Sequence, residues 1–310
     1  MIEPLVPMST GQLLDRTFAL YRNNFILFVG IAALGPAASL VFQLLMVGSV
    51  GVPGAVPVRP EAALASMSMG LIVGFFVVFA GMAISQAATV RAVAAVHLGR
   101  EITIAGAYKA LRGRLWRVLF IFVSVMVLAC LGAGVIATIA IIVGTLAVVG
   151  GAHAGTGGAI LGVLVAVAAA VGGAVLAIAI YIRYSLAIQA CVVEDLRVFA
   201  SLKRSAVLSK GARGRVLAVI LVFGVLGFVI GIALWGLAAG LAAVVHNPFV
   251  ALILTDLASF VSGSLTGPLA TIGISLLYYD ERVRKEAFDL ELMMASLDAP
   301  APPLTAPAQI

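Results

Sequence analysis

The sequence predicts an all-α polytopic integral membrane protein with six transmembrane helices and short amphipathic helices at the membrane interface. Apolar residues make up 63% and charged residues 10% of the 310 residues, against about 45–50% and about 25% in soluble domains. Residues 118–182 form a run of 65 without a single Lys, Arg, Asp or Glu. The basic residues also alternate with the apolar runs, as they do in multi-pass proteins.

The charge-free run is too long for a soluble core, because each helix of a globular domain needs a polar face toward water. Two membrane-crossing helices joined by a short turn explain it, since about 20 apolar residues span the hydrocarbon. The glycine-rich stretch 150–158 provides the turn.

The first crossing contains Gly35-Pro36, which predicts a kink, and a loop rich in Gly and Pro follows it at 48–61. The sixth begins at Asn247 followed by Pro248, a good helix cap with proline at the first helical position, and Gly267-Pro268 predicts a second kink. The six predicted crossings cover residues 25–47, 66–96, 119–150, 158–193, 216–245 and 248–279.

Short amphipathic segments precede the first, third and fifth crossings, and a fourth follows the sixth. Their apolar residues recur at spacings of three and four, with basic residues such as Lys109 and Lys203 beside them. Such helices lie flat in the headgroup layer. The apolar positions are Leu14, Phe18, Tyr21 and Phe25; Ile104, Tyr108, Leu111 and Leu115; Val198, Leu202 and Ala206; and Val283, Ala287, Leu290 and Met294.

The pattern of a flat helix followed by two crossings predicts a single membrane domain, residues 1–298, built from three repeats of roughly 90 residues. The repeats are 9–98, 99–193 and 194–297, and an even number of crossings in each makes them parallel. The remaining tail, 299–310, is rich in Pro and Ala and is predicted to be disordered.

The distribution of charge predicts that both termini are cytoplasmic. Eighteen of the 19 Lys and Arg residues precede residue 25, lie within 91–117 or 183–215, or follow residue 279, and only Arg59 lies elsewhere. This alternation is the positive-inside pattern of a membrane protein, so the pI of 9.7 does not indicate nucleic acid as a partner. Cys130 and Cys191 are interpreted as buried thiols.

The sequence shows no recognisable set of catalytic residues. The chain is therefore predicted not to be an enzyme and to need no cofactor. The three histidines, His97, His153 and His246, lie at different membrane boundaries, and none has a second ligand three or four residues away. The sequence therefore predicts no metal site.

Two groups of polar residues are functional candidates. Asp256, Ser259 and Thr266 recur on one face of the sixth crossing, where they could line the path of an ion or solute, or Asp256 could simply be wet at a protruding helix end. Arg183 in the fourth crossing could snorkel to the inner headgroups or bind a lipid phosphate. The basic residues Lys203, Arg204 and Lys210 are expected to contact anionic lipid.

Three stretches resemble a known membrane domain: LLDRTFALYRNNF from Leu13, EDLRVFASLKRSAVLSKG from Glu194, and PLATIGISLLYYDERVRKEAFDLEL from Pro268. Together they are similar to the membrane domain of some bacterial glycerophosphoryl diester phosphodiesterases and to related multi-pass proteins. The resemblance implies a six-helix module in a bacterial inner membrane. The catalytic barrel of those enzymes has no counterpart in this sequence, so their activity is not transferred.

The resemblance also implies roles for the junction after the sixth crossing. Tyr278 and Tyr279 would anchor at the interface, with Asp280, Arg282, Arg284 and Lys285 at the level of the lipid headgroups.

The leading hypothesis is a non-catalytic module that engages membrane lipid, a partner protein or a second copy of itself. The alternative is a transporter or channel for a small solute or lipid, with Asp256 as the ion-coupling residue. A lipid-headgroup enzyme is the third reading, but it requires clustered acids or histidines that the sequence does not contain.

Overall fold

The computed structural model describes residues 7–50, 60–151, 156–245 and 247–287, and within these ranges every regular element is an α-helix. Six stretches are long and apolar enough to cross a membrane, which confirms an all-α polytopic membrane protein. The predicted tail 299–310 lies outside the described residues. The helices are α1 (Thr10–Asn23), α2 (Phe25–Ala32), α3 (Leu34–Val50), α4 (Pro60–His97), α5 (Ile104–Lys109), α6 (Leu115–Gly151), α7 (Thr156–Tyr184), α8 (Ala187–Glu194), α9 (Val198–Leu208), α10 (Arg213–Val245) and α11 (Pro248–Glu286).

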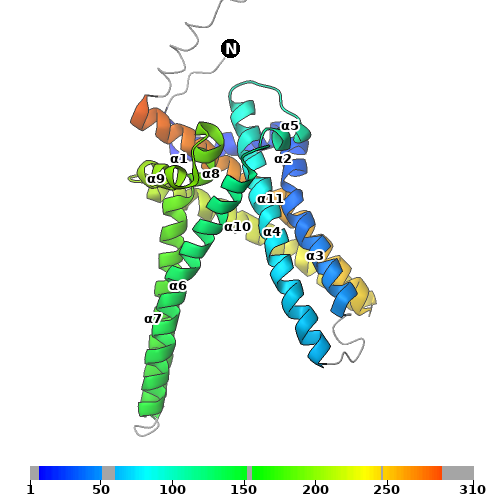
Figure 1. Cartoon of the computed structure of the whole chain (residues 1–310), viewed down its shortest axis with the longest axis vertical. Helices are drawn as coiled ribbons and strands as arrows, with labels where there is room; N and C mark the ends of the chain where they lie inside the picture. The colour runs from blue at the N-terminus through cyan, green and yellow to red at the C-terminus, as the bar shows by residue number, and fades with distance from the viewer. Residues whose placement is uncertain (1–6, 51–59, 152–155, 246, 288–310) are drawn as a thin grey trace, which may run out of the picture.

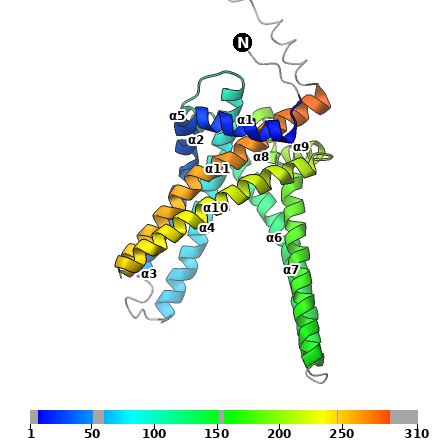
Figure 2. The ribbon, with the colours of Figure 1, turned by 180° about the vertical axis from the view of Figure 1, so that it is seen from behind.

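The long helices form three hairpins, α3–α4, α6–α7 and α10–α11 (Figure 1). The hairpin of α6 and α7 diverges from the other two, and the divergence is also clear from behind (Figure 2). The short helices α1, α5, α8 and α9 gather at one end of the molecule, which we call the capped end. Each hairpin follows at least one short helix, as the repeat predicts, but the threefold repeat itself stays a prediction.

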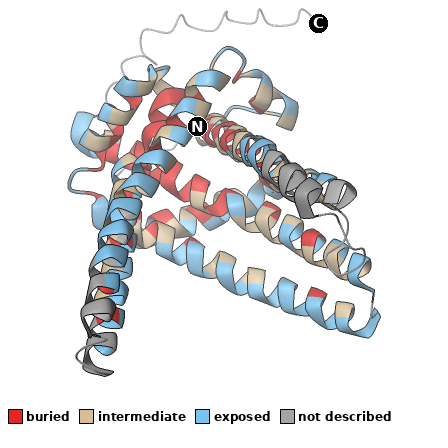
Figure 3. Ribbon diagram, turned by 60° about the horizontal axis from the view of Figure 1, so that its bottom comes forward, coloured by how far each residue is buried: buried red, intermediate tan, exposed pale blue. Residues whose placement is uncertain are grey.

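Burial is concentrated at the capped end, where the three hairpins converge (Figure 3). The core there includes fully buried Leu13, Phe28, Leu186 and Leu276. Away from it the helices expose large apolar side chains, such as Leu131 on α6 and Phe228 on α10, both more than 60% exposed. A membrane supplies the apolar surroundings that these side chains need.

The first predicted crossing is divided into α2 and α3 at Ala33, three residues before Pro36. A proline inside a helix leaves the carbonyl four residues earlier without its usual donor. Here the hydroxyl of Ser85 donates to the carbonyl oxygens of Ile31 (3.1 Å) and Ala32 (3.3 Å), and that of Tyr108 donates to Ile31 (2.6 Å). Side chains from α4 and α5 thus satisfy the backbone at the break.

The fourth predicted crossing contains a break, because α7 ends at Tyr184 and a separate helix, α8, follows it. Ser205 of α9 and Ser209, the residue that caps α9, bind the backbone at this break. Ser205 accepts a hydrogen bond from the Leu186 amide (3.1 Å) and donates to the Arg183 carbonyl (3.0 Å), to which Ser209 also donates (3.1 Å). The end of α7 is therefore capped by side chains 19 to 26 residues further along the chain.

The predicted cap of the last crossing is confirmed, since the side chain of Asn247 accepts hydrogen bonds from the amides of Phe249 and Val250. The helix continues past Pro268 to Glu286, seven residues beyond the predicted end. Beside the proline, the hydroxyl of Tyr21 on α1 donates to the carbonyl of Leu265 (2.7 Å). A side chain of a neighbouring helix thus hydrogen-bonds to the backbone one turn before the proline.

The apolar faces of the short helices pack against the bundle, one of the two surroundings that their amphipathic pattern allows. Leu14, Ile104, Tyr108 and Leu202 all contact the core cluster, and Phe18 lies with its ring centroid 5.4 Å from that of Phe223 on α10. Burial raises the pKa of the Tyr108 hydroxyl to about 12, so it stays a neutral donor to Ile31 at physiological pH.

The break between α2 and α3 makes a testable prediction. Ser85→Ala leaves the Ala32 carbonyl without this donor, and we expect a loss of about 1 kcal/mol of stability. Tyr108→Phe removes a donor to Ile31 and should cost a similar amount. Thermal unfolding of the purified protein in detergent measures both effects. Ser39→Ala is the matched control, since Ser39 only donates within its own helix at 3.4 Å; an equal loss in this control would contradict the assignment.

Candidate functional site

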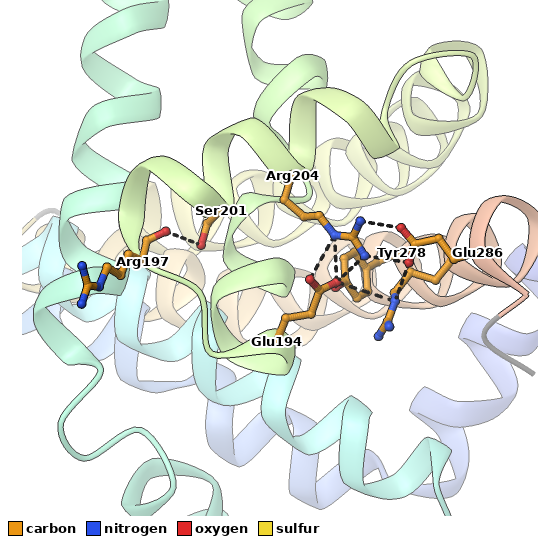
Figure 4. Close-up of polar contacts among 7 residues, drawn as sticks. Glu194, Arg197, Ser201, Arg204, Tyr278 and Glu286 are labelled. Atoms are coloured by element: carbon orange, nitrogen blue, oxygen red, sulfur yellow. Dashed lines mark hydrogen bonds and ion pairs between the residues drawn. The ribbon is translucent and has the colours of Figure 1, made fainter. Parts of the chain in front are cut away.

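The capped end is held by ion pairs among α8, α9 and α11, and their centre is Arg204 (Figure 4). The guanidinium of Arg204 binds both carboxylate oxygens of Glu194 at 3.0–3.1 Å and binds Glu286, with Nη2 2.6 Å from Oε2. The hydroxyl of Tyr278 donates to Glu194 as well. Arg282 contacts the same two carboxylates, at 3.6 Å from Glu194 and 3.2 Å from Glu286. We call this set the Arg204 cluster.

The local fold explains how Glu194 reaches this position. It is the last residue of α8, and Asp195 follows in the left-handed conformation with φ of 55°. This turn ends the helix and sends the chain toward α9, while the side chain of Asp195 pairs with Arg114 (2.8 Å) and Arg117 (3.0 Å) before and within α6. The two adjacent acids thus bind two different parts of the capped end.

A second group of ion pairs lies deeper, around two acids of α11 whose side chains are 0% and 4% exposed, Asp280 and Glu281. Arg215 of α10 binds both, at 2.6 Å and 2.7 Å. Arg284 binds Asp280 at 2.8 Å, and Lys285 binds Glu281 at 2.9 Å. We call this set the Arg215 cluster.

The Arg215 cluster also fixes the start of the described chain. The amide of Met8 donates to Asp280 (2.6 Å), and its carbonyl accepts from Arg215 (2.9 Å) and Arg284 (2.7 Å). Lys285 donates to the carbonyls of Leu208 (2.6 Å) and Lys210 (2.8 Å), at the end of α9. One cluster therefore ties α1, α9, α10 and α11 together.

Hydrogen bonds and nearby charge keep Arg204 firmly protonated. The hydrogen bond to Glu286, aided by the hydrogen bond and negative charge of Glu194, raises the pKa of the Arg204 guanidinium above its ordinary value, although partial burial acts in the opposite direction. Charge-assisted bidentate contacts of this kind are the strongest hydrogen bonds in proteins.

The seven basic residues that the sequence assigns to lipid headgroups fall into two classes. Those engaged in ion pairs within the protein are Arg204, Arg282, Arg284 and Lys285. Those exposed at the capped end and outside any ion pair with the described residues are Arg183, Lys203 and Lys210. The second class has its charge available to an external partner.

Other exposed basic residues extend this second class over the capped end. The side chain of Arg197 points away from the Arg204 cluster (Figure 4), and Arg183 lies over the ring of Tyr184 at 5.6 Å. None has an ion pair with another described residue. We call the whole set the free basic surface: Arg22, Arg100, Lys109, Arg112, Arg183, Arg197, Lys203, Lys210 and Arg213.

The assignment of Tyr278 and Tyr279 as interfacial anchors is wrong. Their side chains are 0% and 3% exposed, inside the protein rather than on its lipid-facing surface. Tyr278 is held by Glu194, and the ring of Tyr279 lies 5.1 Å from that of His97 on α4. Other helices surround this part of α11, so its tyrosines are buried. On a helix without such neighbours, the same residues would face the lipid headgroups.

The predicted polar face of α11 is divided among different surroundings. Asp256 is 6% exposed, and its Oδ2 atom has no hydrogen-bond partner among the described residues. Ser259 is exposed and accepts from the indole N–H of Trp235 on α10 (3.3 Å). The side chain of Thr266 packs 3.5 Å from the position that a Cβ on Gly227 would occupy. The three side chains share no hydrogen-bond partner among the described residues.

Sequence reasoning missed that Glu194, Asp280 and Glu281 are the acids on which the capped end is assembled. One signal was available, because Asp280 and Arg284, Glu281 and Lys285, and Arg282 and Glu286 are each four residues apart, a spacing that pairs side chains on a helix. The contacts of Arg204 with Glu286 and of Arg215 with Glu281 could not be found this way, since they join residues 82 and 66 positions apart.

The described part of the chain contains no group of three or more His, Cys, Asp or Glu side chains that could hold a metal ion. Comparison with protein-family models, curated proteins and solved structures finds no match to this chain. The resemblance to the phosphodiesterase membrane domain therefore remains an expectation from the sequence.

Removing Arg215 tests the deeper cluster. Arg215→Gln leaves Asp280 and Glu281 buried with one cation fewer, and breaking a buried pair costs about 3–5 kcal/mol. Arg284 and Lys285 remain, so we expect the lower end of that range, seen as a clear fall in the thermal unfolding midpoint. Arg213→Gln is the matched control, because Arg213 is exposed and two residues away. Equal midpoints for the two variants would show that the cluster does not stabilise the fold.

Proposed function

We propose that this chain is a non-catalytic module of a bacterial inner membrane that binds anionic lipid through its capped end. In this proposal the capped end and both termini face the cytoplasm. The support for this orientation is the concentration of Lys and Arg at that end, which follows the positive-inside rule. The support for a bacterial inner membrane is the resemblance of the three sequence stretches.

The observation that carries the proposal is the division of the basic residues at the capped end. Arg204, Arg215, Arg282, Arg284 and Lys285 pair with the acids of the two clusters. The free basic surface lies beside them, outside any ion pair with the described residues. A surface that only needed solubility would mix charges of both signs, whereas an excess of exposed cations suits an anionic partner.

Lipid is the partner that the position of this surface favours. The short helices place their apolar faces against the bundle and leave Lys109, Lys203 and Lys210 exposed at the level where the membrane-crossing helices begin or end. Each basic residue near an anionic membrane surface contributes about 1 kcal/mol. An acidic partner protein or a second copy would meet the same charges, and lipid analysis separates these cases.

The triple variant Arg183→Gln, Lys203→Gln and Lys210→Gln tests the proposal. At about 1 kcal/mol, or about fivefold, for each residue, we expect purified protein to retain far less anionic lipid relative to zwitterionic lipid. Native mass spectrometry or lipid extraction from the purified protein measures this ratio. The thermal unfolding midpoint should stay unchanged, because none of the three residues is in an ion pair within the described chain.

A control variant distinguishes the effect of charge at this surface from the effect of the protein's net charge. Arg59→Gln removes a basic residue from the one segment that departs from the charge pattern, and it should leave the lipid ratio as it is. An unchanged ratio in the triple variant would refute lipid binding by this surface. A ratio that falls equally in the control would show that net charge alone governs retention.

One observation favours the alternative function, a transporter or channel. Asp256 is buried in a membrane-crossing helix and has an oxygen atom without a described partner, and intramembrane carboxylates are costly and often functional. Transport would use this carboxylate to bind a proton or a cation.

Asp256→Asn tests the alternative, because the amide keeps the size of the carboxylate and removes its ability to ionise. If Asp256 couples transport, proteoliposomes carrying a pH-sensitive or cation-sensitive dye should show flux with the unaltered protein and none with the variant. Thr255→Val is the control on the neighbouring position and should retain flux. Absence of flux from the unaltered protein would remove the support that Asp256 gives to transport.

A further inference from the structure

The diverging hairpin creates an apolar cleft at the crossing of α4 and α6. The cleft has a volume of about 430 Å³ and is lined almost only by carbon. Aromatic rings from both helices form its walls, with Phe75, Phe76 and Phe79 on α4 and Trp116, Phe120 and Phe122 on α6. The space falls within the range of about 300–1,000 Å³ typical of binding pockets.

The aromatic walls are ordered by their own contacts. The ring centroids of Phe75 and Phe79 lie 4.1 Å apart, and Phe79 meets Phe122 edge to face across the two helices at 5.8 Å. These ring contacts fix the two walls of the cleft relative to each other. At its opening the side chains of Phe76, Phe120 and Trp116 remain 63%, 63% and 77% exposed, so large apolar surface faces whatever enters.

The cleft is apolar, and basic residues precede its Trp116 in the chain. Trp116 is in the first turn of α6, at the capped end, and tryptophan is enriched where membrane and water meet. The two residues of the free basic surface nearest in the chain are Lys109, which ends α5, and Arg112, four residues before Trp116. The neighbouring Arg114 and Arg117 are paired with Asp195 and so are committed elsewhere.

We propose that this cleft is a binding site for one anionic glycerophospholipid. An acyl chain lies between the aromatic walls of α4 and α6, and the phosphate is bound by Lys109 and Arg112. The two parts of such a lipid match these two features of the protein. The apolar cleft suits a hydrocarbon chain, and the two exposed cations, which have no ion pair among the described residues, suit a phosphate. This inference rests on the proposed orientation and lipid-binding function, and it assigns that function a particular site.

Photo-crosslinking locates the lipid directly. The full chain is placed in nanodiscs of phosphatidylcholine with a minor fraction of phosphatidylglycerol that carries a diazirine in one acyl chain, and the crosslinked peptides are mapped by mass spectrometry. We expect adducts concentrated at residues 75–80 and 116–123, several-fold above those on the exposed face of α10. Even labelling of all lipid-facing positions would overturn the proposal.

Two sets of variants make the test specific. Lys109→Gln with Arg112→Gln should remove the preference of the cleft for the phosphatidylglycerol probe over a phosphatidylcholine probe that carries the same diazirine. Ala80→Trp fills the cleft and should reduce its adducts several-fold, whereas Val225→Trp on the exposed face of α10 should leave them unchanged. Because the first pair changes only exposed side chains, it keeps the proposal testable even if Ala80→Trp does not fold.

The outcome can be separated from that of the proposed function. If the triple variant of Arg183, Lys203 and Lys210 still lowers anionic lipid retention while the cleft shows no enrichment, the cleft assignment fails and lipid binding by the capped end stands. Adducts in the cleft that persist in the triple variant support the assignment. Crosslinks that join two chains through cleft residues would show a second copy in the cleft and would overturn it.

Discussion

The structure of the capped end depends on the burial of two carboxylates, Asp280 and Glu281, in the last helix. A buried charge is tolerated only when it is paired and hydrogen-bonded, so each acid requires cations from elsewhere in the chain. Arg215 comes from α10 and binds both, while the backbone of Met8 supplies a further donor. The requirement to satisfy these two groups brings the start of the described chain, α9, α10 and α11 to one place.

Because buried acids need cations, some basic residues have a structural role and others stay available at the surface. Cations that reach an acid on another element are structural, and Arg204 is the clearest case, since it joins α8, α9 and α11 through Glu194 and Glu286. The cations of the free basic surface do not reach one among the described residues and remain exposed. A high content of Lys and Arg therefore does not measure the capacity for an external anionic partner. In the proposed function, Arg183, Lys203 and Lys210 bind lipid because the fold has left their charges exposed.

Breaks in the membrane-crossing helices follow a second rule, which is that freed backbone carbonyls inside a membrane protein need replacement donors. Ser85 and Tyr108 donate to carbonyls at the break before Pro36, and Ser205 and Ser209 donate to the end of α7. Tyr21 also donates to a crossing helix, at Leu265 beside Pro268 in the unbroken α11. Each donor comes from a different element than the carbonyl it serves. The short helices of the capped end thus do more than lie at the interface, because they also stabilise bends in the crossings.

The sequence alone determined the membrane class, the number of crossings and the positions of the short amphipathic helices before them, because hydropathy and helical periodicity are local properties of the chain. It also determined the cap at Asn247, where the donors are two and three residues away. The tertiary structure alone decided that Tyr278 and Tyr279 are buried, that Asp256 is enclosed, and which cations are paired. Those outcomes depend on contacts such as Arg204 with Glu286, 82 residues apart, and Met8 with Asp280, 272 apart, which no local pattern specifies.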